Sequence, residues 1–229
     1  MEEAMKSRGV RDYISPSDLT FLWSKCKKCF WLKYNKGISS PVTMPLVGPM
    51  AAQQEKLYRY TPTREISPLL GNGIVTKWGE AVNSKPLEIN GEVTRWRIKG
   101  KYDILVKFDD DRAGLIDCKV TSSDINQGKV DHYWPQLEAY AYALENPLTG
   151  PAYVVSETGL LIWKVFKAET DFEYTFNFNS KMDYLSAGRN PAMFNLFIEE
   201  VIALLEGEIP DSSEKCDWCN YVAKRNHAA

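Results

Sequence analysis

The spacing of apolar residues predicts helices near the start of the chain and a run of strands after them. Ser15 and Pro16 are typical of a helix start, and apolar residues then recur at helical spacing over 19–34. A second, shorter helix is predicted from about Met44 to Tyr60. From 74 to 121 the pattern changes to alternating, β-branched residues separated by turn residues, which indicates a meander of strands.

The second half of the chain returns to helical periodicity and then to strands. Helical spacing covers 130–146, just before Pro147, and the stretch 152–166 resembles a hairpin that turns near 157–159. A further strand is predicted at 172–179, and Asn190-Pro191 opens a last long helix that ends at about Glu206. This order of elements predicts an α/β fold, in which a mixed sheet is covered by helices.

Composition narrows the class of protein without naming it. The chain has 229 residues, 28 Lys and Arg against 30 Asp and Glu, and 44% hydrophobic residues, which excludes a disordered, collagen-like or coiled-coil chain. No long apolar run occurs at the N-terminus or elsewhere, so we expect neither secretion nor membrane insertion and predict a cytoplasmic protein. A chain of this length buries a large core and does not depend on disulfides to fold.

Positive charge is concentrated in two stretches although the net charge is only -2. Five lysines and no acid lie between Ser24 and Lys36. Basic residues also alternate along a predicted strand. Such stretches indicate either a phosphate-binding surface or an ordinary solvated face, and both remain open. The residues of the second stretch that we consider for DNA binding are Arg95, Arg97, Lys99 and Lys101.

Two acids and a lysine are predicted to converge in the middle of the chain. The stretch 98–121 reads as two strands joined by an acidic turn at 109–111, so Asp103 on the first strand can approach Asp117 on the second. Because side chains alternate along a strand, Asp117 and Lys119 share one face and the intervening cysteine points to the other. Ionised carboxylates in apolar strands are costly unless a cation compensates them, and hard oxygen ligands suit Mg²⁺ or Mn²⁺. A structural Asp–Lys ion pair is the alternative.

The residues around this group form an ordered series: Gly100-x-x-Asp103, then Asp117-x-Lys119, then Gln136-x-x-x-Tyr140 on the next helix. The series resembles the RecB-like branch of the PD-(D/E)XK nucleases, which includes the CRISPR-associated RecB-like exonucleases. The resemblance implies a restriction-endonuclease-like fold with a mixed central sheet flanked by helices.

The resemblance also implies a role for each residue of the series. Asp103, Asp117 and the backbone carbonyl of Cys118 would hold the Mg²⁺ or Mn²⁺ ion, and Lys119 would be the catalytic lysine. Gln136 and Tyr140 lie one helical turn apart and would support the site or touch the DNA strand.

One residue departs from the RecB-like pattern. Relatives usually carry a histidine on the helix before the strands, and this chain has Ala52 after Gly48-Pro49-Met50-Ala51. Glu55, one helical turn beyond Ala52, is the candidate to replace that ligand, and a solvent-facing glutamate is the alternative. His132 is a candidate DNA contact or an exposed histidine.

Four of the five cysteines form two CxxC pairs, one near each end of the chain. Without a signal peptide such pairs favour a metal over disulfides, and four thiolates suit Zn²⁺ or an iron-sulfur cluster. Several RecB-like nucleases hold a [4Fe-4S] cluster with cysteines before and after the core, so we favour that cluster and keep Zn²⁺ as the alternative. The division here is two and two, whereas one and three is usual in those relatives. The proposed ligands are Cys26, Cys29, Cys216 and Cys219.

Together these features predict one nuclease-like domain over 1–229, with a nuclease core at 44–180. The segments 15–36 and 207–229 would form the cysteine metal site. The expected function is Mg- or Mn-dependent DNA hydrolysis, as an exonuclease on single-stranded or frayed ends. The alternatives are a catalytically inactive DNA-binding or assembly subunit with the same fold, and a metal-cluster scaffold protein. The expected partner is DNA, single-stranded by resemblance, with no membrane; a homo-oligomer or a repair partner is left open.

Overall fold

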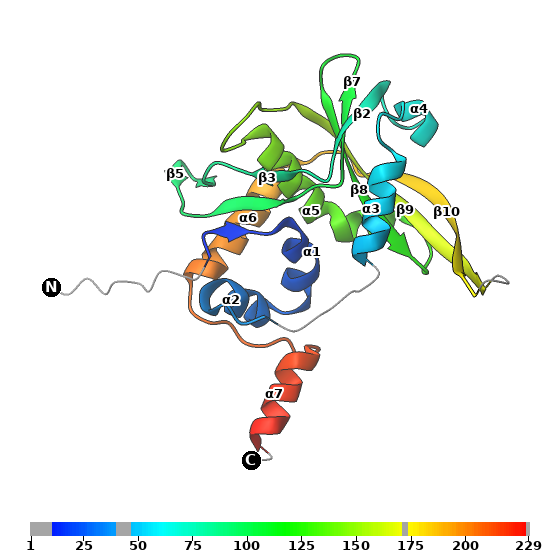
Figure 1. Ribbon diagram of the computed structural model, residues 1–229. Helices are drawn as coiled ribbons and strands as arrows, with labels where there is room; N and C mark the ends of the chain where they lie inside the picture. The colour runs from blue at the N-terminus through cyan, green and yellow to red at the C-terminus, as the bar shows by residue number, and fades with distance from the viewer. Residues whose placement is uncertain (1–10, 40–46, 171–173, 228–229) are drawn as a thin grey trace.

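The computed structural model describes residues 11–39, 47–170 and 174–227, and it is an α/β fold built around a mixed five-stranded sheet (Figure 1). The strand order is β10-β9-β8-β7-β2, in which β8 and β9 are parallel and the other neighbours are antiparallel. A second sheet has the order β1-β6-β3, and β4 pairs with β5. The strands are β1 (Tyr13–Ile14), β2 (Gly73–Trp78), β3 (Ala81–Asn83), β4 (Glu88–Ile89), β5 (Glu92–Val93), β6 (Arg97–Lys101), β7 (Ile104–Phe108), β8 (Ala113–Thr121), β9 (Val155–Thr170) and β10 (Phe176–Ser186).

Helices cover both faces of the central sheet. The helices are α1 (Pro16–Lys25), α2 (Lys27–Lys36), α3 (Val47–Leu57), α4 (Thr63–Ile66), α5 (Gln127–Glu145), α6 (Pro191–Glu206) and α7 (Asp217–His227). The helices predicted at 130–146 and 190–206 are confirmed, and Asn190 caps α6 by accepting a hydrogen bond from the N–H of Met193 at 3.1 Å. Residues 44–46 of the predicted second helix and 172–173 of the predicted strand lie outside the described residues.

The core consists of two buried clusters, one on each face of the sheet. Leu115 and Leu160 face the larger cluster, which α1, α2, α5 and α6 complete. Ile116 and Leu161 face the smaller one, together with residues of β2 and β7. Neighbouring residues on β8 and β9 therefore point to opposite faces, as strand alternation requires. The prediction of a mixed sheet between helices is confirmed.

Two sequence predictions about single segments are wrong. The helix expected over 19–34 is broken at Cys26, where φ is -162° and ψ is 112°, and the chain restarts as α2. The hairpin expected at 157–159 does not form, because β9 runs straight through these residues. Gly159 is not a turn residue; it leaves room for the ring of Tyr184, which a Cβ at this position would overlap.

The predicted strand before the acidic turn is two strands in different sheets. Residues 97–101 form β6 of the three-stranded sheet, and residues 104–108 form β7 of the central sheet. Tyr102 and Asp103 lie at the crossing, while Asp111 adopts a left-handed turn conformation with φ of 64° between β7 and β8. Asp103 thus lies where the chain passes from one sheet to the other.

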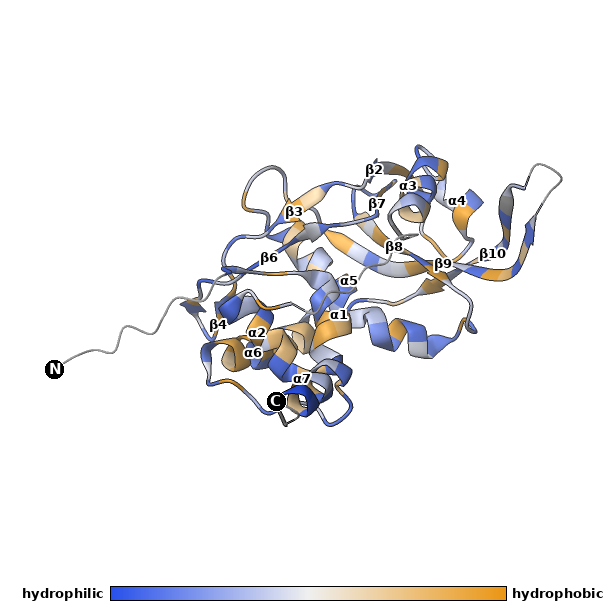
Figure 2. Ribbon diagram, turned by 60° about the horizontal axis from the view of Figure 1, so that its bottom comes forward, coloured by the Kyte–Doolittle hydropathy of each residue, from blue (hydrophilic) through white to orange (hydrophobic). Residues whose placement is uncertain are grey.

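Two elements extend from the body of the molecule. The distal parts of β9 and β10 form a two-stranded ribbon, and α7 stands apart from the sheet below α2 (Figure 1). Figure 2 shows α7 as mostly hydrophilic, in agreement with its exposed side chains. Among the described helices, none is both long and apolar enough to cross a bilayer.

Candidate active site and cysteine metal centre

Asp103, Asp117 and Lys119 converge on the α5 side of the sheet, as strand alternation predicts. Ile104 pairs with Ile116, so the next residues in this register are Asp103 and Asp117. Oδ2 of Asp103 accepts a hydrogen bond from the N–H of Cys118 at 2.7 Å. Asp117 is 3% exposed and forms an ion pair with Lys119, while the side chain of Cys118 packs in the cluster on the other face.

The charges of this group strongly affect one another. Burial and the charge of Asp117 raise the pKa of Asp103 to about 7, although Lys119 opposes the shift. Burial lowers the pKa of Lys119, but the two aspartates outweigh it and the net pKa is raised. Lys119 is therefore a fixed positive charge at neutral pH, and Asp103 is ionised only at an electrostatic cost.

The residue types and their surroundings fit a divalent cation. Asp117 Oδ2 is buried and contacts Nζ of Lys119, and the described residues offer it no other partner. Two carboxylates that repel each other in a buried place are a favourable donor set for Mg²⁺ or Mn²⁺, which prefer oxygen ligands. The side chains present thus fit the ion that the sequence resemblance implies.

Gln136 reaches this group from α5, which packs over β8 and β9. Its Nε2 donates a hydrogen bond to Asp117 Oδ1 at 2.7 Å, and both side chains are buried. This bond fixes the orientation of the Asp117 carboxylate and leaves its Oδ2 toward Lys119. The helix α5 bears Gln136 despite an internal proline at Pro135.

Tyr140 lies one turn further along α5 and holds the strand that leads to Asp103. Its hydroxyl donates a hydrogen bond to the carbonyl of Lys101 at 2.7 Å. Gly100 makes this approach possible, because a Cβ at that position would lie 2.9 Å from Cε1 of Tyr140. Gly100 and Tyr140 therefore tie α5 to the end of β6, two residues before Asp103.

Glu55 points from α3 toward the same region. Its carboxylate accepts a hydrogen bond from Nζ of Lys101 at 3.0 Å, and its charge is among the causes that raise the pKa of Asp103. Gly79, with φ of 58°, lies against this carboxylate, and its N–H donates to the carbonyl of Asp103 at 2.8 Å. The side chain of Glu55 is 13% exposed and not solvated. Ala52 on the same helix is exposed.

The four basic residues considered for DNA binding have different surroundings. Arg95 contacts Glu206 at 2.9 Å and stacks on Trp96, and Arg97 is paired with Asp12. Lys99 lies 5.2 Å from the centre of the Tyr13 ring. Lys101 pairs with Glu55, whose charge acts on Asp103.

Three aromatic side chains form a group beside Lys119, and the sequence alone points to only one of them. Nζ of Lys119 lies 4.8 Å from the centre of the Tyr133 ring, and Tyr133 contacts both Phe21 at 5.6 Å and His132 at 5.0 Å, centre to centre. Phe21 comes from α1 and is 45% exposed. The sequence singles out His132, but the pairing of α1 with α5 that adds Phe21 carries no local signal.

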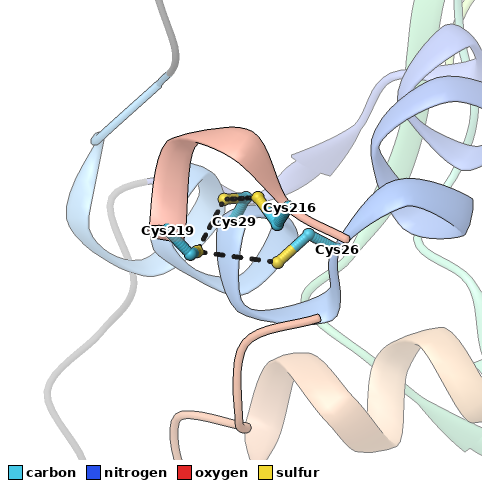
Figure 3. A group of neighbouring side chains, drawn as sticks. All are labelled: Cys26, Cys29, Cys216 and Cys219. Carbon is cyan, nitrogen blue, oxygen red and sulfur yellow. Dashed lines mark hydrogen bonds between the residues drawn. The ribbon is translucent and has the colours of Figure 1, made fainter. Parts of the chain in front are cut away.

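The four terminal cysteines form one compact group (Figure 3). Their sulfurs all lie within 4.8 Å of one another, and all are free thiols. Among the described residues, no other group of three or more His, Cys, Asp or Glu side chains gathers as closely. The prediction that these residues meet across the chain is therefore confirmed, and the group can hold a metal.

Burial and the contacts between sulfurs shift the pKa values of the cysteines in different directions. Burial and the hydrogen bonds with neighbouring sulfurs raise the pKa of Cys29, and burial is the main cause that raises the pKa of Cys219 to about 11. Burial would also raise the pKa of Cys26, but hydrogen bonds from the backbone of Ser213 and Cys29 lower it to about 7. A bound cation would remove the repulsion between four thiolates.

Comparisons with known proteins agree with the fold and show the family of the chain. The crystal structure of SSO0001 matches the fold with a TM-score of 0.51 and 15% sequence identity, covering 92% of this chain and 82% of that chain. No curated protein matches the sequence. The model of the PD-(D/E)XK nuclease superfamily matches residues 46–223, which include both aspartates, Lys119, Gln136 and Tyr140. The chain belongs to the PD-(D/E)XK nuclease superfamily.

Proposed function

We propose that the protein is a Mg²⁺- or Mn²⁺-dependent deoxyribonuclease that acts as an exonuclease on single-stranded or frayed DNA ends. The observation that carries this proposal is the convergence of two carboxylates on Lys119: the buried Asp117, whose Oδ2 contacts Lys119, and Asp103, whose charge and that of Asp117 repel each other. A purely structural ion pair does not need the second, repelling carboxylate of Asp103. Membership of the nuclease superfamily supports the same reaction. A cytoplasmic location stays a prediction.

The contacts of each site residue indicate its role in the proposed reaction. Asp103 and Asp117 hold the cation, with the carbonyl of Cys118 as a further candidate ligand and Glu55 as the candidate on α3. When bound, the cation supplies charge neutralisation on the phosphate and makes the attacking water more acidic. Lys119, protonated at neutral pH, orients that water and stabilises the charge that builds on the phosphate. Gln136 and Tyr140 are positioning residues, since each acts through a hydrogen bond to the strands of the site.

The aromatic group beside Lys119 supports a single-stranded substrate. Phe21, His132 and Tyr133 pack against one another, Tyr133 lies beside Lys119, and Phe21 exposes nearly half of its surface. An unpaired base can stack on such a surface, whereas a base inside a duplex cannot leave its neighbours without cost. Burial and the charge of Lys129 lower the pKa of His132, which keeps this imidazole neutral at neutral pH.

The reaction is tested with Lys119→Ala. We expect cleavage of labelled single-stranded DNA in Mn²⁺ to fall by roughly 10²-fold or more, because a charge next to the phosphate is lost. Lys85→Ala, an exposed lysine between β3 and β4, is the control and should cleave normally. Circular dichroism shows whether both variants fold. Retained Mn²⁺-dependent cleavage in folded Lys119→Ala would refute the assignment.

The stacking surface is tested separately, by DNA binding in the Lys119→Ala background. Phe21→Ala should weaken binding of a single-stranded oligonucleotide by about 5- to 150-fold, since one stacked base is worth about 1–3 kcal/mol. Phe178→Ala is a matched control, because Phe178 is 47% exposed on the β9–β10 ribbon. Equal binding by both variants would remove the stacking role and leave the nuclease proposal standing.

An inactive DNA-binding subunit is the second candidate, and the exposed alanine at position 52 is the observation that favours it. That candidate predicts DNA binding without cleavage by the wild-type protein in Mg²⁺ or Mn²⁺. It also predicts that Lys119→Ala changes nothing in the cleavage assay.

A further inference from the structure

The four-cysteine centre differs from the cluster that the RecB-like resemblance suggests. Three pairs of sulfurs lie close together: Cys26 and Cys219 are 3.8 Å apart, Cys29 and Cys216 are 3.6 Å apart, and Cys29 and Cys219 are 3.6 Å apart. We infer that this centre holds a single tetrahedral zinc ion, in place of a [4Fe-4S] cluster. The inference goes beyond the proposed nuclease function and does not depend on it.

The sulfur separations match one shared ion. For Zn–S bonds of about 2.3 Å in a tetrahedron, any two sulfurs lie about 3.8 Å apart. These three separations fall at or just below this value, and no two of the four sulfurs are more than 4.8 Å apart. The separations are also much longer than the bond of a disulfide, which is about 2.05 Å.

A [4Fe-4S] cluster does not fit the same side chains. In such a cluster each thiolate binds a different iron and points away from the others, so its four cysteine sulfurs stand farther apart than they do around one ion. Four irons and four sulfides would have to fit between sulfurs that all lie within 4.8 Å of one another. Both helices that carry the cysteines would have to separate to admit them.

The two CxxC segments have the same position at the start of a helix. Cys26 directly precedes α2 and Cys29 lies in its first turn; Cys216 directly precedes α7 and Cys219 lies in its first turn. The carbonyl of the leading cysteine accepts the first helical bond in both, from Phe30 and from Asn220, each at 3.0 Å. The two helix N-termini therefore meet at the sulfurs, as Figure 3 shows, and their free N–H groups favour the negative charge of four thiolates around a divalent ion.

The charges nearby do not replace the ion. Lys25 pairs with Asp217 at 3.7 Å, Lys27 with Glu200 at 3.8 Å, and Lys33 with Asp18 at 2.7 Å. These three lysines thus contact carboxylates, so their charges are already paired and do not compensate the thiolates.

The ion has a second consequence, for α7. Most of this helix is exposed, with Tyr221 at 60% and Val222 at 51%, and Figure 1 shows it standing away from the sheet. The cysteines join α7 to α2, although Cys29 and Cys219 are 190 residues apart in the sequence. Removal of the ion should therefore release α7 first.

The experiment uses the full chain, produced with both iron and zinc in the medium and purified without oxygen. Elemental analysis should find one zinc per chain and no stoichiometric iron or sulfide. Cys216→Ser and Cys219→Ser should lose the zinc, and Cys118→Ser, the control for the fifth cysteine, should keep it. Replacement of zinc by Co²⁺ should give the absorption of a tetrahedral four-thiolate site. Iron and sulfide in place of zinc, or no uptake of Zn²⁺ or Co²⁺ by folded protein, would overturn the inference.

A second readout follows α7 directly and needs no activity. A zinc-selective chelator should make the chain cleavable by trypsin near Lys215 and Lys224, with a shorter half-life than the zinc-bound protein. Added Zn²⁺ should restore protection. Equal cleavage with and without zinc would contradict the role of the ion in holding α7.

Discussion

The carboxylate site and the cysteine centre both collect groups that repel one another when ionised, but they are stabilised differently. Asp117 is held by Gln136 and Lys119, and Asp103 by the N–H of Cys118. The cysteine sulfurs contact mainly each other, and the lysines beside them pair with carboxylates. The first site is thus formed by contacts between its own side chains and is strained by charge, whereas the second is a group of sulfurs that can hold a metal and, on the inference above, is stabilised by one. Metal should therefore govern chemistry in one region and structure in the other.

The largest expected effect is on catalysis, from Asp103→Asn. Cleavage should fall by about 10²-fold or more, because one of the two cation-holding carboxylates is lost. At pH 7 and without divalent metal the variant should nevertheless unfold at a higher urea concentration than the wild type. The reason is that the substitution removes the charge whose pKa is raised by burial and by Asp117.

Asp109→Asn is the matched control for this variant. Asp109 is an exposed acid in the turn after β7. Its substitution should change neither the urea midpoint nor the cleavage rate. If Asp103→Asn were less stable than the wild type, the Asp103 carboxylate would stabilise the fold. The carboxylate site would then not be strained by charge, and the contrast with the cysteine centre would be wrong.

Removal of the cysteine metal should have the next largest effect, and on stability. Cys219→Ser should lower the free energy of unfolding by about 2–5 kcal/mol, the range typical for losing a cross-link that closes a long loop. Urea denaturation with tryptophan fluorescence measures this change. Zinc added to the wild type should raise the midpoint, while zinc added to the variant should not. A variant as stable as the wild type would show that the centre is no structural anchor.

Gly100→Ala should have a smaller effect that links packing to the active site. The added Cβ would lie 2.9 Å from Tyr140 and 3.0 Å from Pro16, so these side chains must shift, at a cost of about 1–3 kcal/mol. Cleavage should also fall, since Tyr140 holds the strand before Asp103. Gly48→Ala is the control, because nothing lies within 4 Å of its added Cβ. Thermal denaturation of both variants distinguishes crowding from a general effect of alanine.

The last expected effect, which needs no substitution, is a pH dependence of the metal-free protein. The pKa of Asp103 is about 7 in the folded chain and near 3.8 when unfolded. The folded state therefore binds more protons in this range, and the contribution of Asp103 to stability should decline as pH rises from about 4 to about 7. Urea midpoints measured across this range in wild type and Asp103→Asn isolate that contribution. Saturating Mg²⁺ should reduce the decline, and a wild-type profile equal to that of the variant would contradict it.

Local signals in the sequence were sufficient for most of the carboxylate site. Strand alternation predicts that Asp117 and Lys119 share a face, and helical spacing places Gln136 and Tyr140 on one side of α5. The two CxxC pairs likewise predict a metal centre, because the spacing within each pair is a local property.

Features that depend on tertiary contacts could not be predicted in this way. The passage of the chain between sheets at Asp103 is set by pairing with β3 and β8, which lie elsewhere in the sequence. Gly159 resembles a turn residue, yet it serves the packing of Tyr184. The exposed Phe21 becomes part of the site only because α1 packs beside α5.

Anomalous diffraction from crystals soaked in Mn²⁺ tests the central assignment most directly. The account predicts a manganese peak between the carboxylates of Asp103 and Asp117, next to Lys119, and its loss in Asp103→Asn. Manganese bound elsewhere, with that place vacant in protein that still cleaves DNA, would contradict it.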